Sequence, residues 1–336
     1  MARLIRAAAL TNYFEVAGHL GLNPQPLLRE VGLSRALLAD PEQRIPLESV
    51  VHLLEASAEA SSCSTFGLRM AESRHLSNFG VISLLLSHQP TLRDALLASM
   101  QYRHLLNESL ALHVEEAGKL VIIREELVGD VPLQSHQSIE LALGVLYRMG
   151  NALLGPQWHP KSVSFSHSSP SDTKVHRRVF NCTLNFDGEF NGIVCSAADL
   201  DRPNTNADPA MARYAKQFVE SLPWASEFSV VHEVRKAIYL MLPMGRASIE
   251  QVAEAQGLTV RTLQRQLEAS GTVFSDLVNE VRRELVVRYM QNPGYSMTTI
   301  SELLGYSIPS SFTRWFNAQF GVSPQEWRTR RNSLKC

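Results

Sequence analysis

The chain has 336 residues, about twice the usual size of one domain, so two domains are expected. Hydrophobic residues make up 45% of the chain and charged residues 19%, with a mean hydropathy of −0.08, which excludes a largely disordered or collagen-like chain. The net charge of −1 decides little about partners, because binding depends on local clusters of charge.

The N-terminal segment is expected to be a helix and not an export signal. Arg3 and Arg6 flank its start, but Thr11 interrupts the apolar run too early for a signal peptide. The longest stretch without Asp, Glu, Lys or Arg, residues 75–92, is broken by several polar side chains and cannot span a bilayer. The sequence therefore predicts a cytoplasmic protein with no membrane partner.

The rest of the N-terminal part combines helices with strands. Helical periodicity covers residues 2–20, 47–60 and 92–106, and it returns at 135–154. Four stretches have the composition of short strands, the first two forming a hairpin: residues 111–114, 120–123, 162–166 and 192–195. The predicted fold class is thus α+β, with a mixed α/β N-terminal domain that contains a mostly antiparallel sheet.

The C-terminal part is predicted to be all-α. Turn formers at 201–209 and Pro223 offer two possible domain borders, and beyond Pro223 no convincing strand remains. Helical patterns follow one another there: residues 230–242, 249–255, 262–269, 273–291, 299–304 and 311–320. We place the domains at residues 1–223 and 224–336.

An internal repeat is the most informative feature of the C-terminal part. In each copy a serine, Ser248 or Ser296, opens a helix that ends at a Gly-containing turn, and a second helix follows. The second helices bury Leu263 and Leu267 in the first copy, and two phenylalanines in the second. Each copy therefore reads as a helix-turn-helix.

The outward faces of the two second helices carry residues suited to DNA. A helix-turn-helix places its second helix in the major groove, where each base pair has a distinct pattern of donors and acceptors. The candidate DNA-binding residues are Arg261, Thr262, Gln264 and Arg265 in the first copy, and Ser310, Ser311, Thr313 and Arg314 in the second. The longer side chains of the first copy predict that it carries more of the sequence specificity.

A long apolar stripe between the copies, within residues 274–291, predicts a linker helix that fixes their spacing. Helix-turn-helix elements also occur in plain helical bundles. There Gln264 and Thr313 would be solvated surface residues, and the arginines would pair with nearby acidic residues. Two copies in register and a net charge of +4 from Thr259 to the C-terminus favour DNA binding. We expect one monomer to insert two helices into adjacent major-groove segments.

These motifs resemble the double helix-turn-helix of AraC/XylS-type bacterial transcription regulators. The resemblance rests on Gly257 to Arg265, Val281 to Leu285, Leu304 to Ser307, the Phe312-x-Arg314-x-Phe316 motif and Gly321 to Arg328. It implies base contacts at Arg261, Gln264, Arg265, Ser310, Thr313 and Arg314. Asn317 stands where a lysine usually follows, so the phosphate contact of that lysine is not expected.

The N-terminal domain resembles the arabinose-binding-type effector domain of the AraC branch that includes ornithine-responsive and virulence regulators. The resemblance implies an effector-responsive activator whose partners are double-stranded promoter DNA, RNA polymerase, a small-molecule effector and a second copy of the chain. It identifies neither the effector nor the residues that bind it.

The remaining residues give little support to an enzyme. The four cysteines lack CxxC spacing, the histidines form no HExxH or HxH motif, and no Gly-x-Ser-x-Gly elbow or glycine-rich phosphate loop occurs. We therefore expect no catalytic residue, metal or cofactor, and mostly free thiols, with Cys182 and Cys195 as core residues or redox sensors. The alternative is a small-molecule-binding enzyme with a helical interaction module.

Overall fold

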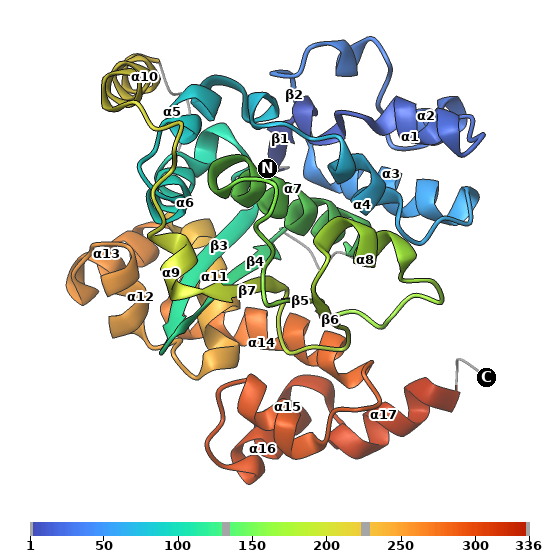
Figure 1. Cartoon of the computed structure of the whole chain (residues 1–336). Helices are drawn as coiled ribbons and strands as arrows, with labels where there is room; N and C mark the ends of the chain where they lie inside the picture. Colours follow the sequence, from blue (N-terminus) through green and yellow to red (C-terminus); the bar gives the residue numbers. More distant parts are fainter. Residues whose placement is uncertain (1–2, 130–134, 223–228, 334–336) are drawn as a thin grey trace. The chain divides into compact units, whose positions relative to one another are not determined.

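The computed structural model describes residues 3–129, 135–222 and 229–333 (Figure 1). The chain divides into two compact units, Met1–Ser226 and Glu227–Cys336. The border predicted between residues 223 and 224 lies outside the described residues. The predicted fold class is confirmed, because the first unit mixes helices with antiparallel strands and the described part of the second is helical.

The first unit contains two sheets. β1 (Leu4–Arg6) and β2 (Arg44–Pro46) form an antiparallel pair. The larger sheet has the order β3-β4-β7-β5-β6, built from β3 (Leu110–Ala117), β4 (Leu120–Leu127), β5 (Ser162–Ser164), β6 (Thr183–Asn185) and β7 (Gly192–Ser196). All its neighbours are antiparallel except β5 and β6. The predicted hairpin is therefore present as β3 and β4, while β6 was missed, because three residues are too few to show alternation.

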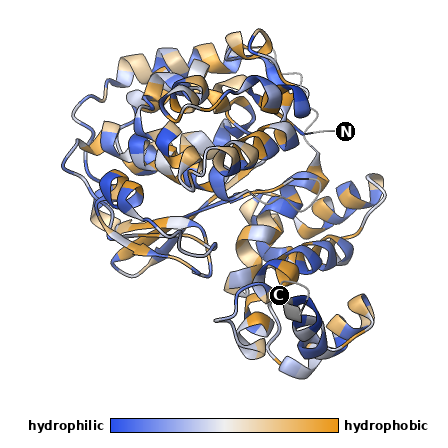
Figure 2. Cartoon of the chain, turned by 90° about the vertical axis from the view of Figure 1, so that its right-hand side faces the viewer, coloured by the Kyte–Doolittle hydropathy of each residue, from blue (hydrophilic) through white to orange (hydrophobic). Residues whose placement is uncertain are grey.

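Helices make up most of the remaining described part of the first unit. They are α1 (Tyr13–His19), α2 (Gln25–Glu30), α3 (Leu47–Ala60), α4 (Phe66–Glu72), α5 (Ser83–Ser87), α6 (Leu92–Gln101), α7 (His136–Leu154), α8 (Lys174–Phe180), α9 (Ala197–Leu200) and α10 (Pro209–Ser221). Four 3-10 helices join them: η1 (Ala7–Leu10), η2 (Leu37–Ala39), η3 (Leu76–Ile82) and η4 (Arg103–Leu105). Figure 2 shows hydrophobic and hydrophilic residues mixed along most helices, as expected where one face of a helix packs inward.

The prediction of one helix over residues 2–20 was wrong at its start. Residues 4–6 form β1, whose Ile5 lies opposite Ile45 of β2, and both side chains are buried. The pair is further held by Arg6, whose Nε donates to the Glu42 carboxylate at 2.8 Å. Pairing with a segment forty residues away overrides the local helical pattern.

Helix α7 joins the two apolar cores of the first unit. Leu143 belongs to the core that includes β4 and β7, and Leu141 to the core of the N-terminal helices. α7 packs so closely on α4 that a Cβ added at Gly67 would lie 2.0 Å from the Gln137 carbonyl oxygen, and one at Gly144 would lie 2.5 Å from the Ala71 Cβ. Glycine is therefore required at both contacts, and α7 is closely packed at the centre of the unit.

The second unit consists of short helices around one apolar core. They are α11 (Val230–Met241), α12 (Ile249–Ala255), α13 (Val260–Ala269), α14 (Phe274–Met290), α15 (Met297–Leu303), α16 (Pro309–Phe320) and α17 (Pro324–Ser333), with the 3-10 helix η5 (Leu242–Met244) after α11. Six of these helices fall on the predicted ranges within a few residues. α17 was not predicted as a helix.

The C-terminal arginines Arg328, Arg330 and Arg331 lie in α17 and do not form a free basic tail. Arg328 Nη1 donates to the Tyr295 carbonyl oxygen at 2.8 Å, and burial lowers the pKa of its guanidinium. Arg330 pairs with Glu326 at 2.5 Å, and Arg331 lies over the Trp327 ring, 4.9 Å from its centroid. The Arg328 bond attaches α17 to the rest of the second unit, whereas the other two contacts lie within α17, and all three arginines already have a partner.

Candidate nucleic-acid interface

Two helix-turn-helix motifs make up most of the second unit. α12 and α13 form the first, and α15 and α16 form the second. The turns need left-handed backbone at Gly257, with φ +66°, and at Gly305, with φ +73°. Ser248 and Ser296 cap the first helix of each copy, accepting hydrogen bonds from Gln251 N at 3.3 Å and Thr299 N at 3.0 Å. The predicted repeat is thus present in both copies.

Helix α13, which has the position of a recognition helix in the first helix-turn-helix, presents three long polar side chains to solvent. Leu263 and Leu267 are buried, while Arg261, Gln264 and Arg265 are exposed. Thr262 is half-buried, and its hydroxyl lies 2.9 Å from that of Thr259, the cap residue of the helix. The Thr262 side chain therefore also supports the start of the helix.

The second recognition helix, α16, has a smaller polar face. Phe312 and Phe316 are buried, and Ser310, Thr313 and Arg314 are exposed. Ser311 is half-buried. Thr313 Oγ1 donates to the Pro309 carbonyl oxygen at 3.2 Å, which leaves its lone pairs for a further donor.

The exposed arginines of both recognition helices are available for a ligand. Among hydrogen bonds and ion pairs between described residues, none involves Arg261, Arg265 or Arg314. In a plain helical bundle these arginines would be expected to meet nearby acids. The arrangement instead leaves cationic groups facing outward at equivalent places, although their contacts with bases remain predictions.

The linker helix α14 holds the second helix-turn-helix by directional contacts. Arg282 Nε donates to the Leu304 carbonyl oxygen at 3.0 Å, and its guanidinium lies 4.2 Å from the centroid of the Tyr306 ring. Trp315 Nε1 of α16 donates to Asn279 Oδ1 at 3.0 Å. These bonds fix both the turn and α16 on the linker helix.

The first helix-turn-helix rests on the same linker helix by apolar packing. Val252, Ala253, Leu263 and Leu267 join the core that contains Val281 of α14. Among the described residues, no hydrogen bond joins a side chain of α12 or α13 to α14. The linker helix therefore holds the two helix-turn-helix motifs by different kinds of contact.

Helices α11 and α14 are joined by a shared carboxylate. Arg235 and Tyr239 of α11 both donate to Glu284 of α14. Burial raises the pKa of Glu284, and the Arg235 charge opposes that shift. This network fixes the orientation of α11 on the linker helix.

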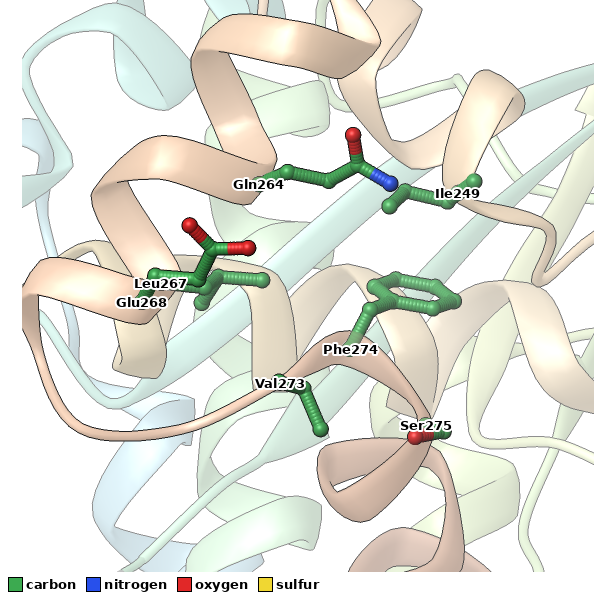
Figure 3. Close-up of a pocket in the computed structure, with 7 residues that line it drawn as sticks. All are labelled: Ile249, Gln264, Leu267, Glu268, Val273, Phe274 and Ser275. Carbon is green, nitrogen blue, oxygen red and sulfur yellow. The ribbon is translucent and has the colours of Figure 1, made fainter.

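A small pocket beside α13 is poorly suited to a metabolite. It has a volume of about 210 Å³ and is lined by Ile249, Gln264, Leu267, Glu268, Val273, Phe274 and Ser275 (Figure 3). Ligand pockets usually enclose about 300–1,000 Å³. The pocket is therefore read as a surface depression at the side of the recognition helix.

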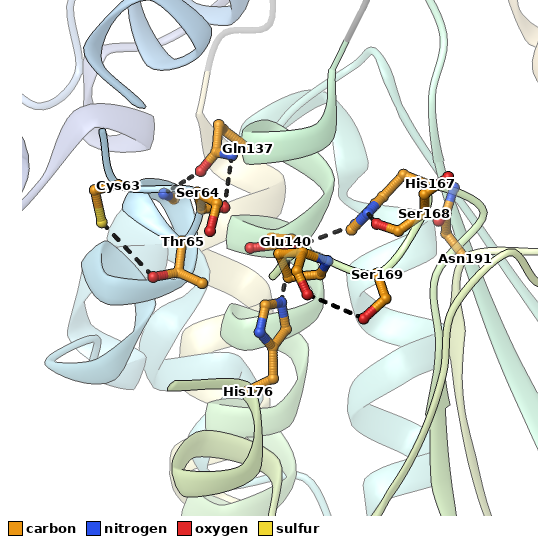
Figure 4. Close-up of polar contacts among 12 residues, drawn as sticks. Cys63, Ser64, Thr65, Gln137, Glu140, His167, Ser168, Ser169, His176 and Asn191 are labelled. Atoms are coloured by element: carbon orange, nitrogen blue, oxygen red, sulfur yellow. Dashed lines mark hydrogen bonds and ion pairs between the residues drawn. The ribbon is translucent and has the colours of Figure 1, made fainter. Parts of the chain in front are cut away.

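The first unit buries ionisable residues near the start of α7 (Figure 4). Glu140 is 1% exposed, with its Oε1 2.7 Å from His176 Nε2 and 3.4 Å from His167 Nε2. Glu55 accepts a hydrogen bond from Gln137 N at 2.8 Å, and burial raises its pKa to about 7. Sequence reasoning did not single out Glu55 and His176, which come from α3 and α8 and meet α7 only in the folded chain.

The described part of this unit offers no metal site, and two of its cysteines have raised pKa values. Within the described ranges, no group of three His, Cys, Asp or Glu residues could hold a metal ion. Burial raises the pKa of Cys182 to about 11 and that of Cys195 to about 12. Since the thiolate is the reactive form, these values argue against the redox-sensor alternative for both cysteines.

A pair of helix-turn-helix units on one linker helix, with cationic outer faces, defines a DNA-binding transcription regulator. The family described as "Arabinose-binding domain of AraC transcription regulator, N-term" matches residues 21–204, and the family "Helix-turn-helix domain" matches residues 252–330. The chain belongs to the AraC family of transcription regulators.

Two relatives of the chain are transcription regulators. The chain is 30% identical to the HTH-type transcriptional regulator VirS of Mycobacterium tuberculosis, covering 98% of this chain and 97% of that protein. It is 22% identical to the ornithine utilization regulator of Pseudomonas aeruginosa, with 97% of each covered. The crystal structure of the regulator CdpR from P. aeruginosa is similar with a TM-score of 0.44 and 19% identity, over 91% of this chain and 96% of that chain. No described helix is long and apolar enough to cross a membrane.

Proposed function

We propose that the chain is an effector-responsive transcription activator without enzymatic activity that reads promoter DNA with α13 and α16. The observation that carries the proposal is the matched exposure of unpaired arginines on two recognition helices joined by one linker helix. Arg261, Gln264 and Arg265 would contact base edges, and Ser310, Thr313 and Arg314 would combine base and phosphate contacts. Thr262 and Ser311, both half-buried, would support the ends of these surfaces.

The direct test is binding of the full chain, and of residues 224–336 alone, to promoter fragments in a mobility-shift assay. Both should retain duplex DNA at low salt, and the logarithm of the affinity should fall with the logarithm of salt at about −0.9 per phosphate neutralised. The fragment also tests the proposed domain border. If neither protein retains any duplex at low salt, the proposal fails.

The first unit is proposed to bind the small-molecule effector. Support comes from its buried ionisable residues near α7, since perturbed pKa values gather at binding sites more often than elsewhere. Burial also raises the pKa of Glu125 of β4 to about 8, and its Oε2 has no hydrogen-bond partner among the described residues. Activation would then pass from this unit to RNA polymerase through the DNA-bound second unit.

Homodimerisation is proposed to use helix α10, which lies at the edge of the first unit beside α5 (Figure 1). Its Ala215 and Val219 are buried, while Met211, Tyr214 and Phe218 are 37%, 60% and 55% exposed. These three side chains form one stripe along the helix, and aromatic residues and Met are enriched at protein interfaces. The same stripe on a second copy would pack against it in a two-fold arrangement, so that each copy covers the exposed side chains of the other.

Replacing both Tyr214 and Phe218 by Ser should convert a dimer into a monomer at micromolar concentration. Removing two aromatic side chains from the centre of an interface commonly weakens it by several kcal/mol. Sedimentation velocity measures the oligomeric state of the chain. The matched control is Lys216→Ser, on the charged side of α10. A wild-type chain that sediments as a monomer, or a dimer unchanged in the double variant, would contradict this surface.

A further inference from the structure

The two recognition helices differ at the residue that precedes them. In the first copy this residue is Thr259, whose hydroxyl accepts a hydrogen bond from Thr262 N at 3.2 Å. In the second it is Ile308, which makes no side-chain cap bond. The turn of the second copy also holds one residue more between its glycine and its recognition helix.

Folding does not explain Ile308. A hydroxyl or carboxamide at this position would stabilise the helix start, and isoleucine is among the poorest residues there. The isoleucine gains little from burial in exchange, because 59% of it is exposed. Its extended backbone, with φ −127° and ψ 116°, is what the following Pro309 favours, so the side chain is held at the entrance of the helix.

We infer that Ile308 reads thymine in the major groove, by packing on the C5-methyl group of that base. The inference rests on the proposed DNA recognition by α16. Residues at the N-terminal end of a recognition helix contact base edges, and thymine is the base that offers a methyl group there. Ser310, the next exposed polar residue of the helix, follows two positions later, and Arg314 follows one turn after Ser310. Ile308 would therefore add an apolar contact to a surface that otherwise offers hydroxyl groups and one guanidinium.

The test removes the thymine methyl group from the DNA. The full chain first selects its preferred duplex from a library of random sequence, and each thymine of that site is then replaced in turn by deoxyuridine, which lacks only the methyl group. Wild-type affinity should fall about fourfold at one position in the half of the site bound by α16, the effect expected for one buried methyl group. Positions elsewhere serve as internal controls.

Ile308→Ser is the matched variant, because serine can cap the helix and should keep the fold intact. It should bind the thymine-containing site about fourfold more weakly than wild type and show no further loss on the deoxyuridine site. Arg265→Ala, in the other recognition helix, should bind more weakly while keeping the fourfold difference between the two sites.

An Ile308→Ser variant that still distinguishes thymine from deoxyuridine as wild type does would overturn the inference, and so would a wild-type chain that binds every substituted site equally well. Either result would leave DNA recognition by α13 and α16 in place. Failure of the full chain to select any duplex would instead overturn the proposed DNA recognition, and the inference with it.

Discussion

Arg265→Ala should reduce affinity for the preferred DNA site by about 5- to 150-fold, while affinity for scrambled DNA falls much less. The side chain is exposed on α13 beside Gln264 and has no ion pair among the described residues, so its guanidinium is available for a bidentate bond to guanine. Such a pair discriminates against the wrong base by about 1–3 kcal/mol. The measurement is a pair of titrations, on the preferred site and on scrambled DNA, at one fixed salt concentration.

Ser310→Ala is the control for this prediction, because its short hydroxyl on α16 is expected to position a phosphate. Its effect should be smaller and nearly equal on the two DNAs. Equal losses on both DNAs for Arg265→Ala would show instead that Arg265 anchors a phosphate, and base reading by the first recognition helix would have to be given up.

Arg282→Ala should destabilise residues 224–336 by about 2 kcal/mol. The variant leaves the Leu304 carbonyl without its side-chain donor and removes the cation that lies over Tyr306, and both losses fall at the turn between α15 and α16. Urea denaturation of the fragment, followed by tryptophan fluorescence, measures the change in the free energy of unfolding. DNA affinity should also fall, because the turn orients α16.

The neighbouring Arg283→Ala is the matched control. Arg283 is exposed, and its contact is a hydrogen bond of 2.8 Å from Nη1 to Gln319 Oε1 at the surface. A surface substitution of this kind should change the free energy of unfolding by less than about 0.5 kcal/mol. Equal effects of the two substitutions would show that the stacked arginine has no special structural role.

The DNA-binding unit could be predicted well because its signals are local. Leu263 and Leu267, and Phe312 and Phe316, lie four residues apart and mark the inner faces of α13 and α16 directly in the sequence. Serine caps and glycine turns then mark where the helices begin and end. The eight candidate residues follow from the same periodicity, because they occupy the positions of each helix that the buried residues do not.

The features that were missed depend on distant partners. β1 forms because Ile5 pairs with Ile45, and Glu140 meets His176 from a helix 36 residues away. α17 was overlooked because its sequence is mostly polar, and its attachment comes through Arg328 and the backbone of Tyr295. No periodicity within one segment indicates such contacts.

The unequal attachment of the two helix-turn-helix units to α14 has a consequence for how operators can vary. Hydrogen bonds such as Arg282 to Leu304 weaken steeply when their angle changes, whereas the apolar contacts of Leu263 and Leu267 are non-directional and tolerate small rotations. When two half-sites differ slightly in helical phase, or the intervening DNA is bent, we expect the first helix-turn-helix to adjust. The second helix-turn-helix would then set the register of the protein on the duplex, and the first would accommodate the shape of each operator.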